Sequence, residues 1–560
     1  MIEKVAILSI SIFLSSIAGL SLIYPIYLQF IMDRFSFSLS HINLYGLSII
    51  IGGFTGFPIG FIYDYYGPKL STLIGTFLLS IGYFLLHLLF TCDIFIGMPI
   101  HPLLILGFII GQGNYLLHTT SLCTNFQNFK FKHNSTIVCL LITNIIISPS
   151  VLITYKSQLT ELQIKKINIY ISLFILLIGL SCFLIMKNLK KPYQEDKLLR
   201  KYQKYKEKHE IQYMVYYNMT TIFIFIIGVF INYIQEDYVF PIIIIYPLLQ
   251  VLNFVFIICE YYGVFDTFFY PEFKKKMDHK IRQIELSHLP NTTNNQPNLH
   301  VSEHKEKNID IFSVNSETEV PFIDAVFSKK FILLVIAITF GIGSALSNIN
   351  NINFILKSIV YEKTHYSGMN KGVISIYKVN ELFIYVILYF TSNTFVRISS
   401  YMLIDIYQKR NTFSHYFIIF SLLGLCSQIL SITMNTTLLY LSIMFIGATH
   451  GAYITFIPLY VKHEFGLINF GKVQGILLTG GSLGVMLISN GLFMCSYKHN
   501  AITNGGDECY GRKCFILSYV ITSILFGINV GIGYTLKKAE EGAKEANKDF
   551  AEMLKKKNII

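Results

Sequence analysis

Two ionisable side chains lie three residues apart within a long apolar run of the sequence. Lys378 and Glu381 would share one face of a helix, where they can neutralise each other. Ionisable groups at bilayer depth are costly and usually line a solute or proton pathway. Asn380 lies between them, and Asn348 and Asn351 close the preceding apolar run. We expect these five residues to line a pathway; a structural ion pair near the outer end of the helix is the alternative.

A second charged set follows another apolar run. Gly60, Asp64, Gly67 and Lys69 occur in the order Gly-x3-Asp-x2-Gly-x-Lys. A carboxylate at a helix end can accept hydrogen bonds from the N-terminal amides of a neighbouring helix, or it can pair with a cation. This order predicts a latch that holds one conformation closed and releases it in another.

Small residues precede the latch at spacings of four. Gly52, Gly56 and Gly60 form a strip on one helix face, on which a second helix can approach closely. Static packing and a sliding interface between two halves both need such a strip, so the spacing leaves both readings open.

Two cysteines near the C-terminus lie five residues apart. Cys509 and Cys514 are predicted on the outer or lumenal side, where a disulfide can form, and Cys495 is a competing partner. The sequence has no zinc-type Cys-x-x-Cys pair, and its glycine-rich stretches lie in apolar runs with no preceding strand. We therefore expect no metal and no cofactor.

The composition identifies the kind of element that positions these residues. Of 560 residues, 53% are hydrophobic and 14% are charged, and the mean hydropathy is +0.53. A soluble chain carries about a quarter charged residues. These values exclude a soluble enzyme, a disordered protein and a disulfide-stapled secreted module, and they predict an all-α polytopic membrane protein. The net charge of +12 comes from clusters between apolar runs, so it reports topology rather than nucleic-acid binding.

A bilayer core of about 30 Å needs about 20 apolar residues of helix. The sequence has fourteen such runs: 5–31, 43–63, 70–90, 97–119, 135–156, 167–187, 212–233, 238–262, 330–351, 372–395, 413–433, 437–461, 473–495 and 515–536. They predict five regions: a six-helix half at 1–190, a basic loop with two extra helices at 191–263, a disordered cytosolic linker at 264–329, a second six-helix half at 330–536 and a basic tail at 537–560.

The distribution of Lys and Arg predicts the orientation. With both termini in the cytosol, the inner segments carry 34 of these residues and the outer segments carry ten. Cytosolic loops hold the excess of positive charge in membrane proteins. We therefore expect both termini to be cytosolic; the sequence does not distinguish the plasma membrane from an organelle membrane.

The latch resembles the loop between the second and third helices of the major facilitator superfamily. Three further segments, 340–351, 464–471 and 509–515, resemble in order the second-half opening helix, the acidic-Phe-Gly-Leu-x-x-Phe-Gly turn and the Cys-x-Gly-x-x-Cys-Phe motif of nodulin-like facilitators. This branch borders the monocarboxylate and oxalate/formate carriers. The resemblance implies two six-helix halves with two extra helices. One departure concerns the family's Asn-x-x-Gly-Arg: Asn380 can be matched, but the Gly-Arg pair is absent there.

These observations favour a secondary transporter that moves a small polar organic solute by alternating access. The resemblance puts organic acids such as monocarboxylates first and amino acids second, and coupling to protons through Glu381 stays open. The alternatives are a non-transporting receptor on a transporter scaffold and, with less support, a membrane enzyme; we expect no enzymatic activity.

His87, His118 and His450 are expected to be interfacial residues whose hydrogen bonds are satisfied. The expected partners are the solute, the lipid bilayer and, if coupled, protons, with the protein a monomer.

Overall fold

The computed structural model describes most of the two predicted six-helix halves. The described residues are 2–92, 97, 99–128, 134–153, 161–186, 320–367, 384–400, 403–404, 413–503 and 509–556. They are helical apart from short connections, and they include no strand. The predicted extra helices at 212–233 and 238–262, residues 264–319 of the linker, and Lys378, Asn380 and Glu381 lie outside the described residues. The last ten residues of the linker, 320–329, are described, and they contain a short helix where the sequence predicts disorder.

The N-terminal half, residues 2–186, consists of helices connected by short turns. Its elements are α1 (Ile2–Gly19), the 3-10 segment η1 (Leu20–Ile26), α2 (Leu28–Phe35), α3 (Leu39–Phe54), α4 (Phe57–Thr91), α5 (His101–Asn128), α6 (Asn134–Ile153) and α7 (Glu161–Ile185). The first predicted span is therefore an interrupted helix, and the interruption contains Pro25, which has no amide hydrogen for an α-helical bond. In α4 the backbone leaves helical geometry at Gly67.

The C-terminal half, residues 320–556, repeats this helical architecture. Its elements are α12 (Phe322–Phe327), α13 (Lys329–Asn350), α14 (Ile352–Ser367), helical residues 384–400, α16 (Phe413–Ile432), α17 (Thr436–Phe465), α18 (Phe470–Val485), the π-helix η7 (Met486–Met494), α19 (Cys495–Thr503), the 3-10 segment η8 (Arg512–Cys514) and α20 (Ile516–Lys556). Because α18, η7 and α19 are continuous, they form one long helical run from residue 470 to residue 503.

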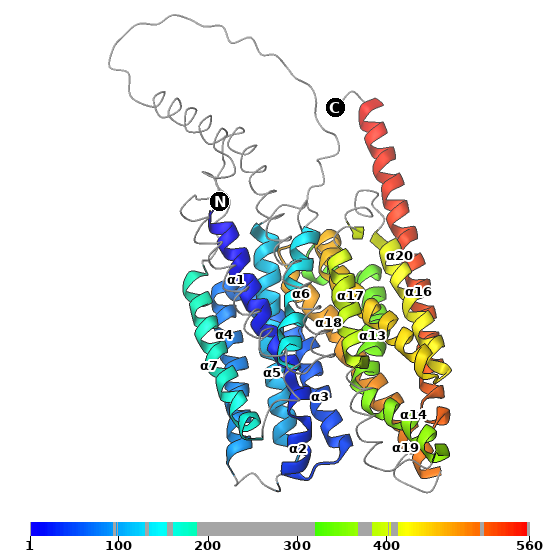
Figure 1. Ribbon diagram of the computed structural model, residues 1–560. Helices are drawn as coiled ribbons and strands as arrows, with labels where there is room; N and C mark the ends of the chain where they lie inside the picture. The colour runs from blue at the N-terminus through cyan, green and yellow to red at the C-terminus, as the bar shows by residue number, and fades with distance from the viewer. Residues whose placement is uncertain are drawn as a thin grey trace, which may run out of the picture.

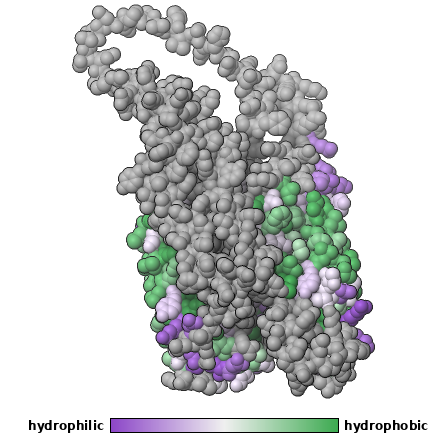
Figure 2. Space-filling view, in the orientation of Figure 1, coloured by the Kyte–Doolittle hydropathy of each residue, from purple (hydrophilic) through white to green (hydrophobic). Residues whose placement is uncertain are grey.

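The two halves are bundles that lie side by side, and the chain termini lie at the same end (Figure 1). Eight helical stretches of the described residues are long and apolar enough to cross a membrane, and one of them, Ser40–Thr91, contains the break at Gly67. Figure 2 shows apolar side chains on the flanks of the described helices and hydrophilic ones nearer the ends. This distribution is that of an integral multi-pass membrane protein.

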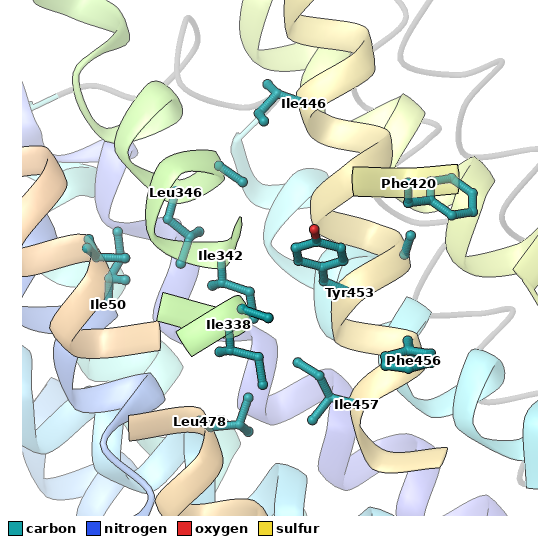
Figure 3. Packing of buried hydrophobic residues seen from close by; sticks show 14 of the residues in the cluster. Ile50, Ile338, Ile342, Leu346, Phe420, Ile446, Tyr453, Phe456, Ile457 and Leu478 are labelled. Atoms are coloured by element: carbon teal, nitrogen blue, oxygen red, sulfur yellow. The ribbon is translucent and has the colours of Figure 1, made fainter. Parts of the chain in front are cut away.

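One apolar cluster joins the halves. Ile50 of α3 belongs to the same buried cluster as Ile338 and Ile342 of α13 and Leu478 of α18 (Figure 3). Tyr453 of α17 faces this group. Polar side chains that interrupt such an apolar interface are therefore the candidates for function.

Candidate functional site

Asp64 joins the two halves at one end of the bundle. Its carboxylate accepts hydrogen bonds from the backbone amides of Gly471 (3.1 Å) and Lys472 (2.9 Å). These amides belong to the first turn of α18, where amide groups have no partner within the helix and carry a partial positive charge. The carboxylate of the N-terminal half thus holds a helix end of the C-terminal half, as the predicted latch requires.

The glycine strip lets α4 and α18 approach closely. A Cβ atom at Gly60 would overlap the carbonyl oxygen of Gly471, and one at Gly56 would lie 2.7 Å from the Cα of Gly475. Gly52 instead belongs to α3 and packs against the backbone of Phe108 on α5, within its own half. The prediction of one helix face for all three glycines is therefore wrong, because the helix breaks at Thr55 and Gly56. Two of the three glycines therefore lie at the interface between the halves, next to Asp64.

The other two latch residues, Gly67 and Lys69, make their contacts within the N-terminal half. Gly67 has φ 74° and ψ −176°, a conformation that glycine adopts more readily than other residues, and it marks the turn after Asp64. The Lys69 ammonium lies 5.0 Å from the ring centroid of Phe183 on α7. Lys69 thus packs against its own half, and the described residues include no ion pair between it and Asp64.

Asn348 and Asn351, two of the predicted pathway residues, have different surroundings. The Asn348 side chain donates to the carbonyl of Ser344 (2.8 Å) and to Gln428 (3.4 Å), so it belongs to a polar network inside the C-terminal half. Asn351 follows α13, donates to Ser489 (2.8 Å) and accepts from Asn43 of α3 (3.1 Å). Asn351 therefore forms an inter-half contact, whereas Asn348 does not. The structure does not place either of them beside Lys378, Asn380 or Glu381, since those lie outside the described residues.

The least expected residue of the interface is Arg397. The predicted apolar run ends at residue 395, which leaves Arg397 in the segment that follows it. The helix instead continues to residue 400, and the Arg397 side chain is only 4% exposed. Its Nη1 donates to the carbonyl oxygen of Ile142 on α6, in the opposite half, at 2.7 Å, and its Nε has no partner. Among the described residues no carboxylate pairs with it. A buried cation without a counter-ion is costly, and an anionic ligand would remove that cost.

Two histidines lie within range of the Arg397 charge. The Nδ1 of His450 is hydrogen-bonded to the Tyr389 hydroxyl (2.7 Å) and to the Asn393 amide (2.9 Å), while its Nε2 has no partner. The Arg397 charge acts on His450 and on His118 of α5, whose Nδ1 also has no partner. The expectation of satisfied interfacial histidines is therefore wrong for both residues.

His87 matches that expectation, because its Nδ1 is hydrogen-bonded to the Lys165 carbonyl at 2.8 Å. At His118, Arg397 and His450, by contrast, polar atoms from both halves lack partners, as a site for a polar ligand between the halves would require.

The sequence does contain a signal for this cluster. Asn393 and Arg397 have the spacing of the Asn-x-x-Gly-Arg motif, with Val396 at the glycine position. This is a second possible match to the motif, and unlike the match at Asn380 it retains the arginine. In the structure, Asn393 and Arg397 lie one turn apart on the same helix, beside His450.

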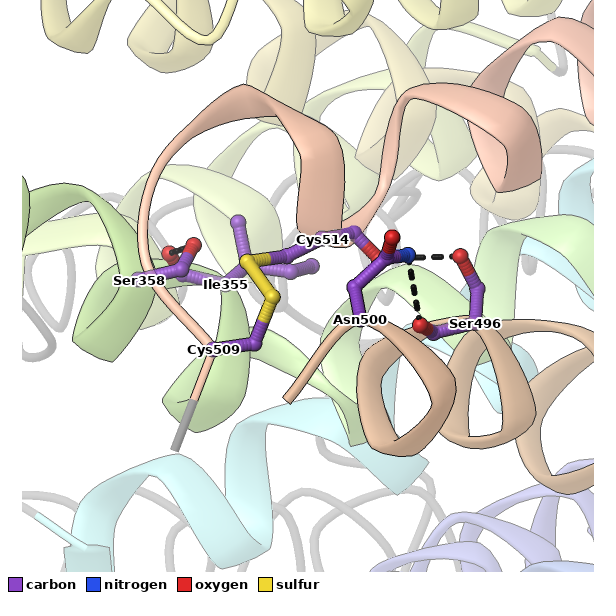
Figure 4. Close-up of a disulfide and its surroundings, with 6 residues drawn as sticks. All are labelled: Ile355, Ser358, Ser496, Asn500, Cys509 and Cys514. Atoms are coloured by element: carbon purple, nitrogen blue, oxygen red, sulfur yellow. Dashed lines mark hydrogen bonds between the residues drawn. A yellow bond between two sulfur atoms is a disulfide. The ribbon is translucent and has the colours of Figure 1, made fainter. Parts of the chain in front are cut away.

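The predicted pair Cys509–Cys514 forms a disulfide at the opposite end of the run that begins with α18 (Figure 4). The Ser496 hydroxyl of α19 donates to the Cys514 carbonyl (3.0 Å), and the Gly511 amide donates to the Ser358 carbonyl of α14 (3.1 Å). Cys495, the competing partner, is a free and exposed thiol. The disulfide loop therefore connects the middle of α14 with the starts of α19 and α20.

Comparisons with known proteins agree with this architecture. Residues 4–259 match the nodulin-like family. The fold is similar to the proton:xylose symporter XylE of the major facilitator superfamily, with a TM-score of 0.54, 12% identity, and coverage of 95% of each chain. It is also similar to the human organic anion transporter MFSD10, with a TM-score of 0.51, 10% identity, and coverage of 95% of this chain and 99% of that one. Comparison with curated protein sequences gave no significant match.

Proposed function

Since the chain has the major facilitator fold and its residues 4–259 match the nodulin-like family, we propose that it is a secondary transporter of small organic acid anions. The observation that carries the proposal is Arg397, a buried cation between the halves with no carboxylate partner among the described residues. Since Nη1 is engaged by Ile142, the side of the guanidinium that bears Nε is left for a carboxylate.

Inter-half contacts at both ends of the bundle support alternating access. Asp64 joins the halves at one end, and the hydrogen bond between Asn43 and Asn351 joins them nearer the other. In the proposed cycle, the solute binds near Arg397 and these contacts are released in turn. A solute between the halves favours closure around itself through its contacts with both of them.

Amino acids are the second substrate class. Their carboxylate would bind Arg397 in the same way, and their ammonium would need an acceptor, for which the unpartnered Asn393 oxygen is available. Proton coupling, through Glu381 or through the histidines beside Arg397, is part of the proposal, as is a monomeric state. A non-transporting receptor is the alternative, since it would need the same binding site without the moving contacts.

Purified protein in proteoliposomes tests the proposal with a panel of labelled monocarboxylates, dicarboxylates and amino acids. We expect saturable, Arg397-dependent uptake of at least one carboxylate. Binding without flux would instead identify a receptor, and neither binding nor flux across the panel would contradict the organic-acid assignment.

Substitution of Arg397 is the sharpest test of the site. We expect Arg397→Gln to reduce uptake at least about a hundredfold, because a charge-assisted contact with an anion is worth roughly 3 kcal/mol. Arg397→Lys keeps the charge but not the planar fork, so it should retain partial uptake with a raised KM. Arg512→Gln is the matched control, because Arg512 is an exposed residue of the disulfide loop. Uptake by Arg397→Gln equal to that of the control would exclude Arg397 from the solute site.

A further inference from the structure

A second buried charge lies at the end of the bundle where Asp64 binds α18. Lys462 is in the last turn of α17 and is only 4% exposed. Its Nζ donates to the carbonyl oxygen of Phe126 at 3.2 Å and lies 4.9 Å from the centroid of the Phe126 ring. Phe126 belongs to the last turn of α5, in the opposite half. Lys462 is thus a contact between the halves, and α17 continues past the predicted 437–461 span to include it.

The contact is the electrostatic counterpart of the Asp64 contact. The last carbonyl groups of a helix have no partner within it and carry a partial negative charge, so a cation binds favourably there. Asp64 extends from the N-terminal half to the positive end of α18, and Lys462 extends from the C-terminal half to the negative end of α5. The two contacts are therefore opposite in charge and in direction.

Both contacts belong to one closed layer. Only four residues separate α17 from α18, so Lys462 and the α18 start lie at the same end of the C-terminal half. The rings of Phe126 and Phe470 lie 5.1 Å apart and join the two sites across the interface. Along α17, Lys462 is twelve residues from His450, or about 18 Å at 1.5 Å per residue, so the layer is separate from the proposed solute site.

We propose that Lys462 is a second latch, which acts with Asp64 to keep this end of the protein closed, and that both contacts break when this end opens. A buried ammonium regains its hydration on opening, which offsets the loss of the helix-end contact. The closed and open states therefore stay close in free energy, as an alternating mechanism requires. The proposal rests on contacts between the halves and does not depend on which solute is carried.

Hydrogen–deuterium exchange of the full-length protein tests the proposal without any solute. The amides of Gly471 and Lys472 are bonded to Asp64 only while this end is closed, so their exchange reports opening. Lys462→Met removes the charge and keeps a side chain of similar length. We expect exchange at the start of α18 to rise about tenfold relative to exchange in the buried part of α20, even though Asp64 is intact. Lys462→Arg keeps the charge, so the ratio of these two exchange rates should stay near its wild-type value.

The matched control is Lys330→Met. Lys330 pairs with Glu464 inside the C-terminal half, so its loss should leave exchange at the α18 start unchanged. Asp64→Asn combined with Lys462→Met should raise exchange at the α18 start, relative to buried α20, more than either single variant does. General destabilisation would raise exchange in α18 and α20 together and leave the ratio unchanged. An unchanged ratio in Lys462→Met, or an equal rise in Lys462→Arg, would overturn the proposal.

Discussion

Arg397 and Lys462 are both basic side chains buried between helices of opposite halves, and each donates to a backbone carbonyl across the interface. The sequence does not predict this burial, because each residue follows an apolar run closely and the positive-inside rule assigns such charges to loops. The contact made by Asp64 is easier to predict, since a carboxylate at a helix end can accept hydrogen bonds from the N-terminal amides of a neighbouring helix. Its partner helix is not predictable, because no local pattern pairs residue 64 with residues 471 and 472.

The predicted pair Lys378 and Glu381 can be tested at the same scale. Replacing one partner leaves an unpaired charge, which costs about 3–5 kcal/mol in a packed interior, so single variants should lower protein abundance. Lys378→Met with Glu381→Gln removes both charges. From the predicted role of the pair in the pathway, we expect normal abundance but uptake reduced about tenfold. Uptake and abundance restored together, with unchanged pH dependence, would show that the pair is only structural.

At the scale of elements, the apolar runs predict the helices of both halves, but they do not predict where those helices end. α17 extends four residues beyond its predicted span and α20 extends twenty, because a helix continues past the bilayer wherever its backbone bonds are satisfied. The breaks inside spans, at η1 and between α3 and α4 at Thr55 and Gly56, also have no counterpart in hydropathy. Hydropathy measures the apolar length of a segment and carries no information on backbone geometry within it.

The close contact of α4 with α18 gives a prediction at this scale. A methyl group at Gly60 meets the backbone of α18, which cannot move aside alone, so Gly60→Ala should force the helices apart at a cost of about 1–3 kcal/mol. We expect a lower midpoint of thermal unfolding and uptake reduced several-fold. Gly531→Ala in α20 is the control, because a Cβ there meets no atom within 4 Å and alanine favours a helix. If both variants behave like the wild type, the glycine strip is not required for a tight interface.

At the scale of the whole molecule, the two-half architecture follows from the sequence more directly than the site does. The count of apolar runs, the central polar segment and the three ordered motifs all indicate two repeated halves, and the fold comparison agrees. The proposed solute site draws on helices from both halves, α5 and α6 from one and residues 384–400 and α17 from the other. Only the packing of the halves brings these residues together, so no single stretch of sequence could identify the site.

The orientation in the membrane is the last prediction. The segments assigned to the inside carry 34 Lys and Arg residues against ten outside, and removing the buried Arg397 and Lys462 does not reverse the excess. The termini lie at the same end of the bundle, as an even number of crossings requires (Figure 1).

We therefore expect an epitope inserted at 291–299 to be accessible only from the cytosol, and one inserted at 504–508, beside the disulfide loop, only from the opposite face. Antibody labelling before and after selective permeabilisation distinguishes the faces, with uptake measured to verify that each insertion leaves the protein active. Labelling of the 291–299 epitope from the outer or lumenal face would reverse the orientation, so that the Asp64–Lys462 layer would close the outer rather than the inner side.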